Sequence, residues 1–304
     1  MSSPRDASTL DPVPSVPDQS VDRQRVHPAS IENDGPAILC LEQASKKYGE
    51  RHALNCVCLA IRPGELVGVI GRSGAGKTTL LRCVACATPL SAGVLRFRGE
   101  DLSTLGARRL RAHRRRVGVI YQQFNLVRRL RVIQNVLVGR LGHLTRGARW
   151  AALAYHFRPT DREAALRCLE HVGLLDRAWQ RTDTLSGGEQ QRVAIAKILA
   201  QDPEMILADE PIASLDLLNG ELVMETLRRI AHDAGLPVLA TLHHVDFARR
   251  YADRVLGFRA GRLVFDGPPA DLGDAALRDV FGERVSTATE AIPLPVRGLG
   301  WATS

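Results

Sequence analysis

Long hydrophobic runs and aromatic residues are both scarce in this sequence. Aromatic residues make up 5% of the 304 residues, and the longest apolar runs have the length of a single strand. A helix that crosses a membrane needs about 20 consecutive apolar residues, so any role at a membrane would have to come from a partner. Because 45% of the residues are hydrophobic, the chain can still bury a full core, in one large domain or in a domain with a subdomain.

Lysine is also scarce, whereas arginine is abundant. Only four of the 41 Lys and Arg residues are lysines, which leaves 37 arginines, and the formal net charge is +8. A basic chain can bind nucleic acid when its charge is concentrated on one face. The arginines are instead spread over every segment, so we interpret them as solvated side chains. We expect the densest run, residues 108–116, to be an exposed helical face.

The six cysteines do not form a complete metal-binding motif. Cys83 and Cys86 make a C-x-x-C pair, but no second pair or His-x-His partner supplies the other two ligands of a zinc site. We therefore expect the thiols to pack in the core of a protein in a reducing compartment.

The two ends of the sequence differ from its middle. Residues 1–36 are rich in Pro, Ser and Asp and lack the apolar segment of a signal peptide, which predicts a disordered N-terminal tail. Residues 285–304 are expected to form a C-terminal tail. The folded domain is expected at residues 37–284, beginning with strands at residues 38–42 and 54–61.

Residues 71–78 have the sequence GRSGAGKT, which matches the phosphate-binding P-loop. The loop lies between a strand-like run and a helix-like run. Its glycines allow backbone N–H groups to approach a polyphosphate closely, and the following helix adds its positive end. We expect Lys77 to reach the β and γ phosphates and the Thr78 hydroxyl to bind Mg²⁺.

Polar side chains follow two further strand-like runs. Gln122 comes after residues 117–121, at the strand end where α/β sheets bind ligands, and could contact Mg²⁺ or the attacking water. The run at residues 205–208 ends in Asp209, which suits Mg²⁺, and Glu210, which suits the activation of water.

A second anion-binding motif lies at residues 185–192, with the sequence LSGGEQQR. A serine and two glycines at the start of a helix provide free backbone N–H groups, but one chain cannot easily use both motifs on one nucleotide. Upstream of the P-loop, Tyr48 could stack on adenine or simply pack at the edge of a sheet, and the sequence leaves both readings open.

Together with ASLD at residues 213–216 and TLH at residues 241–243, these motifs resemble an ABC-transporter ATP-binding subunit, over residues 37 to about 270. The resemblance implies an α/β fold: a P-loop NTPase core with an N-terminal antiparallel β subdomain and a helical signature subdomain at about residues 125–200. It also implies ATP and Mg²⁺ as cofactors.

The resemblance assigns a role to each motif residue. It implies adenine stacking by Tyr48, a general base at Glu210, a γ-phosphate sensor at His243 and an inter-subunit contact by Asp216. It implies Mg²⁺ binding by Thr78, Gln122 and Asp209, and phosphate binding by Gly71, Arg72, Ser73, Gly74, Ala75, Gly76, Lys77, Thr78 and Thr79. The opposite subunit's ATP is expected to be capped by Ser186, Gly187, Gly188, Glu189 and Gln190. Gln122 is also implied at the transmembrane interface. The sequence departs from the family pattern at His244, where an acidic or amide residue is usual.

Residues 124–127, 135–142, 211–216 and 242–246 are similar to the ATPase subunit of phosphonate importers. That resemblance implies a homodimer that works with two transmembrane permease subunits and a solute-binding protein. It also implies a peripheral location on the cytoplasmic face of the plasma membrane. The ATPase subunits of amino-acid and phosphate importers remain alternatives.

Two other classes of function fit the sequence less well. A soluble ABC ATPase that acts on nucleic acid would carry long coiled-coil or zinc insertions, or a second ATPase cassette, and none is present in the sequence. No nucleic acid partner is therefore expected. A non-catalytic scaffold is opposed by Lys77, Asp209, Glu210 and His243, which are all retained.

Overall fold

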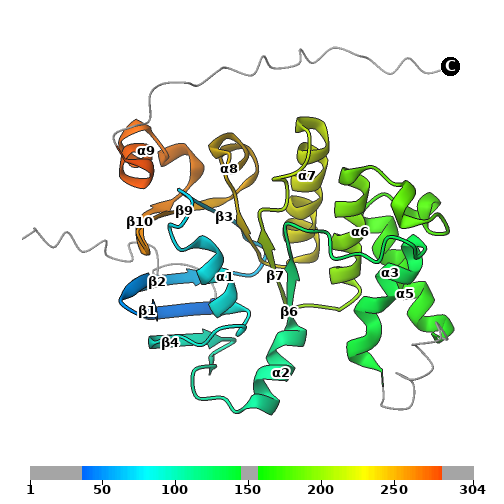
Figure 1. Ribbon diagram of the computed structural model, residues 1–304, viewed down its shortest axis with the longest axis horizontal. Coiled ribbons are helices and arrows are strands. Elements are labelled where there is room, and N and C mark those ends of the chain that lie inside the picture. The colour runs from blue at the N-terminus through cyan, green and yellow to red at the C-terminus, as the bar shows by residue number, and fades with distance from the viewer. Residues whose placement is uncertain (1–35, 145–156, 283–304) are drawn as a thin grey trace, which may run out of the picture.

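The computed structural model describes residues 36–144 and 157–282. The two predicted tails lie outside the described residues, apart from residue 36. Within the described part, the predicted α/β core with an antiparallel β subdomain and a helical subdomain is confirmed (Figure 1).

The N-terminal subdomain is a four-stranded antiparallel sheet in the order β2-β1-β4-β5. Its two long strands extend well beyond the predicted ranges. They turn back tightly at Gly49, whose φ of +57° is in the region that favours glycine. The strands are β1 Leu39–Tyr48, β2 Arg51–Ile61, β4 Ala92–Phe97 and β5 Glu100–Asp101.

The central sheet has six strands in the order β10-β9-β3-β8-β7-β6, and only the β9–β10 pair is antiparallel. Strand β3 is buried along its whole length, as expected for a parallel strand covered on both faces. Strand β8 separates β3 from β7, so the carboxyl ends of these three strands meet at one edge. The strands are β3 Leu66–Gly71, β6 Val117–Ile120, β7 Met205–Asp209, β8 Val238–Thr241, β9 Arg254–Arg259 and β10 Arg262–Gly267.

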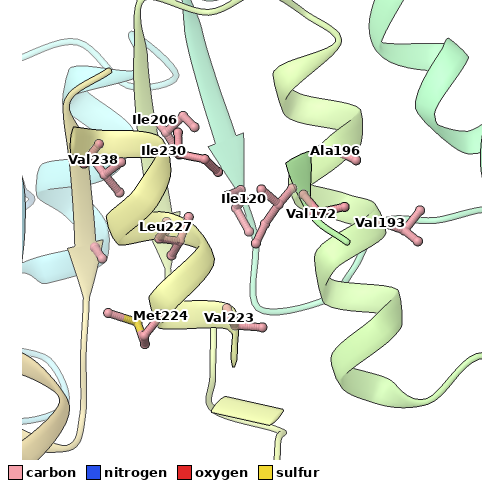
Figure 2. Packing of buried hydrophobic residues seen from close by; sticks show 14 of the residues in the cluster. Ile120, Val172, Val193, Ala196, Ile206, Val223, Met224, Leu227, Ile230 and Val238 are labelled. Atoms are coloured by element: carbon pink, nitrogen blue, oxygen red, sulfur yellow. The ribbon is translucent and has the colours of Figure 1, made fainter. Parts of the chain in front are cut away.

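The central sheet carries a hydrophobic core on each face. One core lies beneath α7 Leu217–Ala234, α8 Val245–Tyr251 and α9 Asp274–Phe281. Figure 2 shows its centre, where side chains of α7 such as Leu227 point toward the strand residues Ile206 and Val238. The other core joins the sheet to the β subdomain and to α1 Lys77–Val84.

A group of three helices, α3 Val132–Gly139, α5 Pro159–His171 and α6 Gly187–Leu199, packs together beyond β6. Gly139 allows α3 and α6 to approach closely, because a Cβ at this position would lie 2.1 Å from the carbonyl oxygen of Lys197. Short 3-10 turns lie at Arg140–His143, Leu175–Arg177, Thr182–Thr184 and Pro269–Asp271.

The predicted exposed helical face at residues 108–116 is confirmed, whereas the expectation for the cysteines needs correction. The arginine-rich run forms α2 Ala107–Arg116 and is mostly exposed, but His113 is buried and packs edge-on against Phe97. Among the cysteines, Cys83 is buried as expected, whereas Cys56 is exposed on a strand. Burial raises the pKa of the Cys83 thiol to about 11. No helix within the described ranges is long and apolar enough to span a membrane.

Candidate functional site

The P-loop connects β3 to α1, and two of its glycines are required by the backbone. Gly71 has a φ of +148°, and a Cβ there would lie 2.3 Å from the carbonyl oxygen of Phe258. Gly76 has a φ of +112°, and a Cβ there would lie 2.4 Å from the carbonyl oxygen of Ala53. Any larger residue would therefore be both strained and in collision with backbone.

Lys77 is the first residue of α1, and its side chain reaches back to the start of the loop. Lys77 is only 5% exposed, and its Nζ donates to the carbonyl oxygens of Gly71 at 2.7 Å and Arg72 at 3.3 Å. Burial lowers the pKa of this ammonium, while Glu210 and Asp209 oppose the shift. The first turn of α1 has no acidic residue. A buried cation beside an uncompensated helix N-terminus fits a polyphosphate.

The predicted metal ligands Thr78 and Asp209 are in contact. The Thr78 hydroxyl lies 3.3 Å from Asp209 Oδ1, across 131 residues of sequence. Mg²⁺ prefers such oxygen ligands and is usually bound by one or two carboxylates together with substrate phosphates, so these two residues fit the ion. The third predicted ligand, Gln122, is exposed on the loop that follows β6 and is hydrogen-bonded to neither residue.

Glu210 and His243 also lie together. His243 Nε2 lies 2.5 Å from Glu210 Oε1; the His243 side chain is exposed, and the Glu210 side chain is half-buried. His244 instead precedes α8 and packs its ring against Phe247, with the ring centroids 6.2 Å apart. Of the two histidines, His243 is therefore the one that faces the predicted general base.

One residue that was not among the predicted site residues joins the two carboxylates. Thr241 Oγ1 lies 2.9 Å from Asp209 Oδ1 and 2.9 Å from the backbone nitrogen of Glu210. Its place at the end of the apolar run at residues 238–240, two residues before the predicted sensor histidine, is the sequence signal that could have identified it.

The start of α6 forms the predicted second anion-binding motif. Ser186 is the N-cap: its Oγ accepts from the Glu189 nitrogen at 3.2 Å, and its own nitrogen donates to Glu189 Oε2 at 2.8 Å. This reciprocal capping box has a sequence signature, a serine followed three residues later by Glu. Gln190 is placed differently from the exposed Ser186, since it is 9% exposed and its side chain donates to the carbonyl oxygen of Leu185.

Asp216 is the N-cap of α7 and is tied to Asn219. Its Oδ1 accepts from the Asn219 nitrogen at 3.0 Å and its Oδ2 from Asn219 Nδ2 at 2.6 Å, and these hydrogen bonds lower the pKa of the Asp216 carboxyl. Asn219 also packs against Gly188, where a Cβ would lie 2.1 Å from Asn219 Oδ1. The segment of Asp216 and the start of α6 are therefore held together within one chain.

Tyr48 lies at the end of β1, near the P-loop. Its strand partner is Arg51, whose Nη2 donates to the carbonyl oxygen of Gly74 at 3.3 Å. The Tyr48 residue is 49% exposed, and Lys46 Nζ lies 5.2 Å from its ring centroid. The ring is accessible to a base, so stacking on adenine stays a prediction.

A cavity of about 300 Å³ lies between the end of β6 and α6. The exposed ring of Tyr121 and the half-buried ring of Phe124 line it beside two basic residues, Arg114 and Lys197. Lys197 Nζ donates to the carbonyl oxygen of Asn125 at 2.8 Å and so holds the loop after β6 against α6.

The chain is similar to known proteins over most of its length. A family model described as ABC transporter matches residues 54–213. The chain is 43% identical over 258 residues to the phosphonates import ATP-binding protein PhnC 2 of Roseobacter denitrificans, which covers 83% of this chain and 94% of the relative. It is 47% identical over 244 residues to the phosphonates import ATP-binding protein PhnC of Rhodopseudomonas palustris, which covers 80% of this chain and 89% of the relative.

The fold is shared with solved structures. A dimeric ATP-binding cassette in a post-hydrolysis state, bound to ADP and Pi, matches with a TM-score of 0.64 and 32% identity over 76% of this chain and 98% of that one. The residues matched by the family model include the P-loop, the start of α6 and both carboxylates. Tyr48, Asp216 and His243 lie outside that range.

Proposed function

This chain belongs to the ABC transporter family, and from that membership we propose that it is the ATP-hydrolysing subunit of a phosphonate importer. The observation that carries the ATPase role is the meeting of three strand ends. There, Lys77 lies in the P-loop, Thr78 contacts Asp209, and Glu210 contacts His243. The assignment of phosphonate as the solute is supported by the names of the relatives and by their sequence identity to this chain, 43% and 47%.

Each residue of the site has a distinct task in this proposal. ATP supplies the γ-phosphoryl group that is transferred to water. Lys77 and the backbone N–H groups of the P-loop hold the phosphates, and Thr78 and Asp209 hold Mg²⁺. Glu210 accepts a proton from the attacking water, while His243 holds the Glu210 carboxylate in position.

The exposed start of α6 requires a second subunit in this proposal. The P-loop of one chain would hold the nucleotide, and residues 186–190 of a second copy would cap it with the free N–H groups of a helix start. The similar solved cassette is itself dimeric, which supports a homodimer. ATP would then close the dimer, and loss of the γ-phosphate would open it.

The cavity between β6 and α6 is the proposed contact with the permease subunits. It is bordered by the loop that carries Gln122 and by the helix that begins at the capping motif, so a permease segment seated there would touch both. A solute-binding protein would be the further partner. Bound to the permease, the chain would lie peripherally on the cytoplasmic face of the membrane.

The role of Glu210 is tested with Glu210→Gln. The amide keeps the shape of the side chain but cannot act as the base, so the variant should bind ATP and accumulate as a closed dimer. Gel filtration with ATP and Mg²⁺ measures this. A variant that elutes only as a monomer would contradict the proposed role.

The shared site is tested by mixing Lys77→Ala with Ser186→Arg, each inactive on its own. In a mixed dimer both lesions fall in one site, and the other site keeps an intact P-loop and an intact capping loop. ATP occlusion should therefore reappear in the mixture. No occlusion above that of either variant alone, with heterodimers confirmed by differential tags, would refute the sandwich.

The solute is tested with the permease and binding protein that co-purify with the chain. ATPase activity of this assembly in vesicles should rise with methylphosphonate, and less with inorganic phosphate or with amino acids. Stimulation by phosphate or amino acids alone would assign the chain to one of the alternative importers, and co-purification of nucleic acid instead of a permease would reject transport.

A further inference from the structure

We propose that Thr241 is a positioning residue that sets both carboxylates of the ATPase site at once. This inference rests on the proposed function. Thr241 is the last residue of β8 and is fully buried. A single side-chain atom, Oγ1, lies 2.9 Å from both the Glu210 nitrogen and Asp209 Oδ1.

The chemistry of a hydroxyl group determines the direction of the two hydrogen bonds. A backbone N–H can only donate, so Thr241 Oγ1 accepts from Glu210. The one hydroxyl proton is then donated to Asp209 Oδ1, because a carboxylate oxygen accepts. The two bonds therefore form a chain from the backbone of one acidic residue, through Thr241, to the side chain of the other.

The conformation of Glu210 explains why such a connection is needed. Its φ is +53°, in the left-handed region that residues with side chains adopt uncommonly. A backbone in such a state persists only where the surrounding structure holds it. The bond from its N–H to Thr241 does so, and the adjacent carboxylates then reach different partners: Asp209 contacts Thr78 and Glu210 contacts His243.

The sheet order places Thr241 between the strand that leads into the P-loop and the strand that ends in Asp209. Thr241 pairs with Asp209 of β7 on one side and with Val69 of β3 on the other. His243 follows two residues later. The end of β8 therefore holds Glu210 at two points: Thr241 binds its backbone nitrogen, and His243 contacts its carboxylate.

The experiment compares Thr241→Val, which keeps the shape but removes the hydroxyl, with Thr241→Ser, which keeps the hydroxyl. The matched control is Thr226→Val in α7. Thr226 is also buried, 3% exposed, and its Oγ1 donates to the carbonyl oxygen of Leu222. The control makes the same chemical change in a helix without altering a bond to either carboxylate.

The melting temperature, the kcat and KM for ATP with Mg²⁺, and the affinity for ATP in EDTA are measured for each variant. The affinity for Mn²⁺ in the presence of a non-hydrolysable ATP analogue is measured by electron paramagnetic resonance. Loss of a group that orients a metal ligand typically costs about 10–100-fold in metal affinity or activity. We expect Thr241→Val to lose roughly this much in Mn²⁺ affinity and in kcat, with ATP affinity in EDTA changed about twofold or less. Thr241→Ser should stay close to the wild type.

The outcomes separate this inference from the proposed function. If Thr241→Val behaves like Thr226→Val, with a changed melting temperature only, Thr241 is merely structural and the inference is overturned. The same conclusion follows if Thr241→Ser is as impaired as Thr241→Val. If Thr241→Val does not fold, Thr241→Ala is measured against the same expectations. A wild type that hydrolyses no ATP would overturn the proposed function and this inference with it. If the wild type is active, the Thr241 variants test the positioning role of Thr241 alone.

Discussion

Replacing Asn135 with Leu should destabilise the region between the Gln122 loop and the start of α6. Asn135 lies in α3 and is 2% exposed. Its Oδ1 accepts from the Val127 nitrogen at 2.8 Å, and its Nδ2 donates to the carbonyl oxygen of Val127 at 3.0 Å and to Thr182 Oγ1 at 2.8 Å. One amide thus joins the segment after Gln122 to the segment that leads to Ser186.

The expected magnitude follows from these three hydrogen bonds. Each contributes about 1 kcal/mol net, so the loss of all three costs roughly 3 kcal/mol. Leucine has the same branch point as asparagine and is larger, so the substitution leaves no cavity. Thr182 is wholly buried, so water cannot replace its lost partner, whereas Val127 is 55% exposed and can recover part of the cost. In a domain of this size, 1 kcal/mol corresponds to about 2–4 °C, which predicts a melting temperature lower by about 6–12 °C.

The assay is thermal unfolding with Gln134→Leu as the matched control. Gln134 precedes Asn135 in the same helix, and its Oε1 accepts from the Arg131 nitrogen at 2.8 Å, at an exposed position. Its loss should cost under about 1 kcal/mol. A double variant with Thr182→Val should lose less than the sum of the two single changes, because both remove one shared bond. The control itself should lower the melting temperature by only about 2 °C. If the melting temperatures of Asn135→Leu and Gln134→Leu differ by less than about 2 °C, the reasoning is refuted.

Three further predictions address other parts of the chain. Tyr48→Ala should raise the Kd for ATP by about tenfold at most, since an aromatic contact contributes roughly 0.5–1.5 kcal/mol; an unchanged Kd in calorimetry would return the ring to simple packing at the sheet edge. Burial lowers the pKa of His113 below its usual 6.5, so the unfolded chain takes up the proton first and stability falls as the pH drops below about 6.5. His113→Leu should remove this component from urea unfolding between about pH 7 and 5, and an unchanged pH slope would contradict it. Gly139→Ala should cost about 1–3 kcal/mol through collision with the carbonyl of Lys197, whereas Gly142→Ala, which has room for a Cβ, should be nearly neutral; equal melting temperatures would reject the close helix contact.

Local patterns were enough to predict the main elements of the site. The P-loop was placed between a buried strand and a helix, which are now β3 and α1, and Asp209 was placed at the end of a buried strand, which is now β7. These predictions succeeded because apolar runs, glycines and cap residues act over a few neighbouring positions. The expectation that the thiols pack in the core was wrong for Cys56, because a strand exposes alternate residues and the sequence does not say which face is covered.

The sequence by itself therefore determined the P-loop, the capping motif and the acidic pair, together with the α/β class. Only the tertiary structure decided which residues meet. In the tertiary structure, His243 and not His244 contacts Glu210, and Thr241 contacts Asp209 although the two are 32 residues apart in the sequence. The physical reason is the strand order β3-β8-β7, which brings the ends of three distant strands to one edge of the sheet. Contacts of that kind depend on how strands are ordered in space, and no local periodicity contains that information.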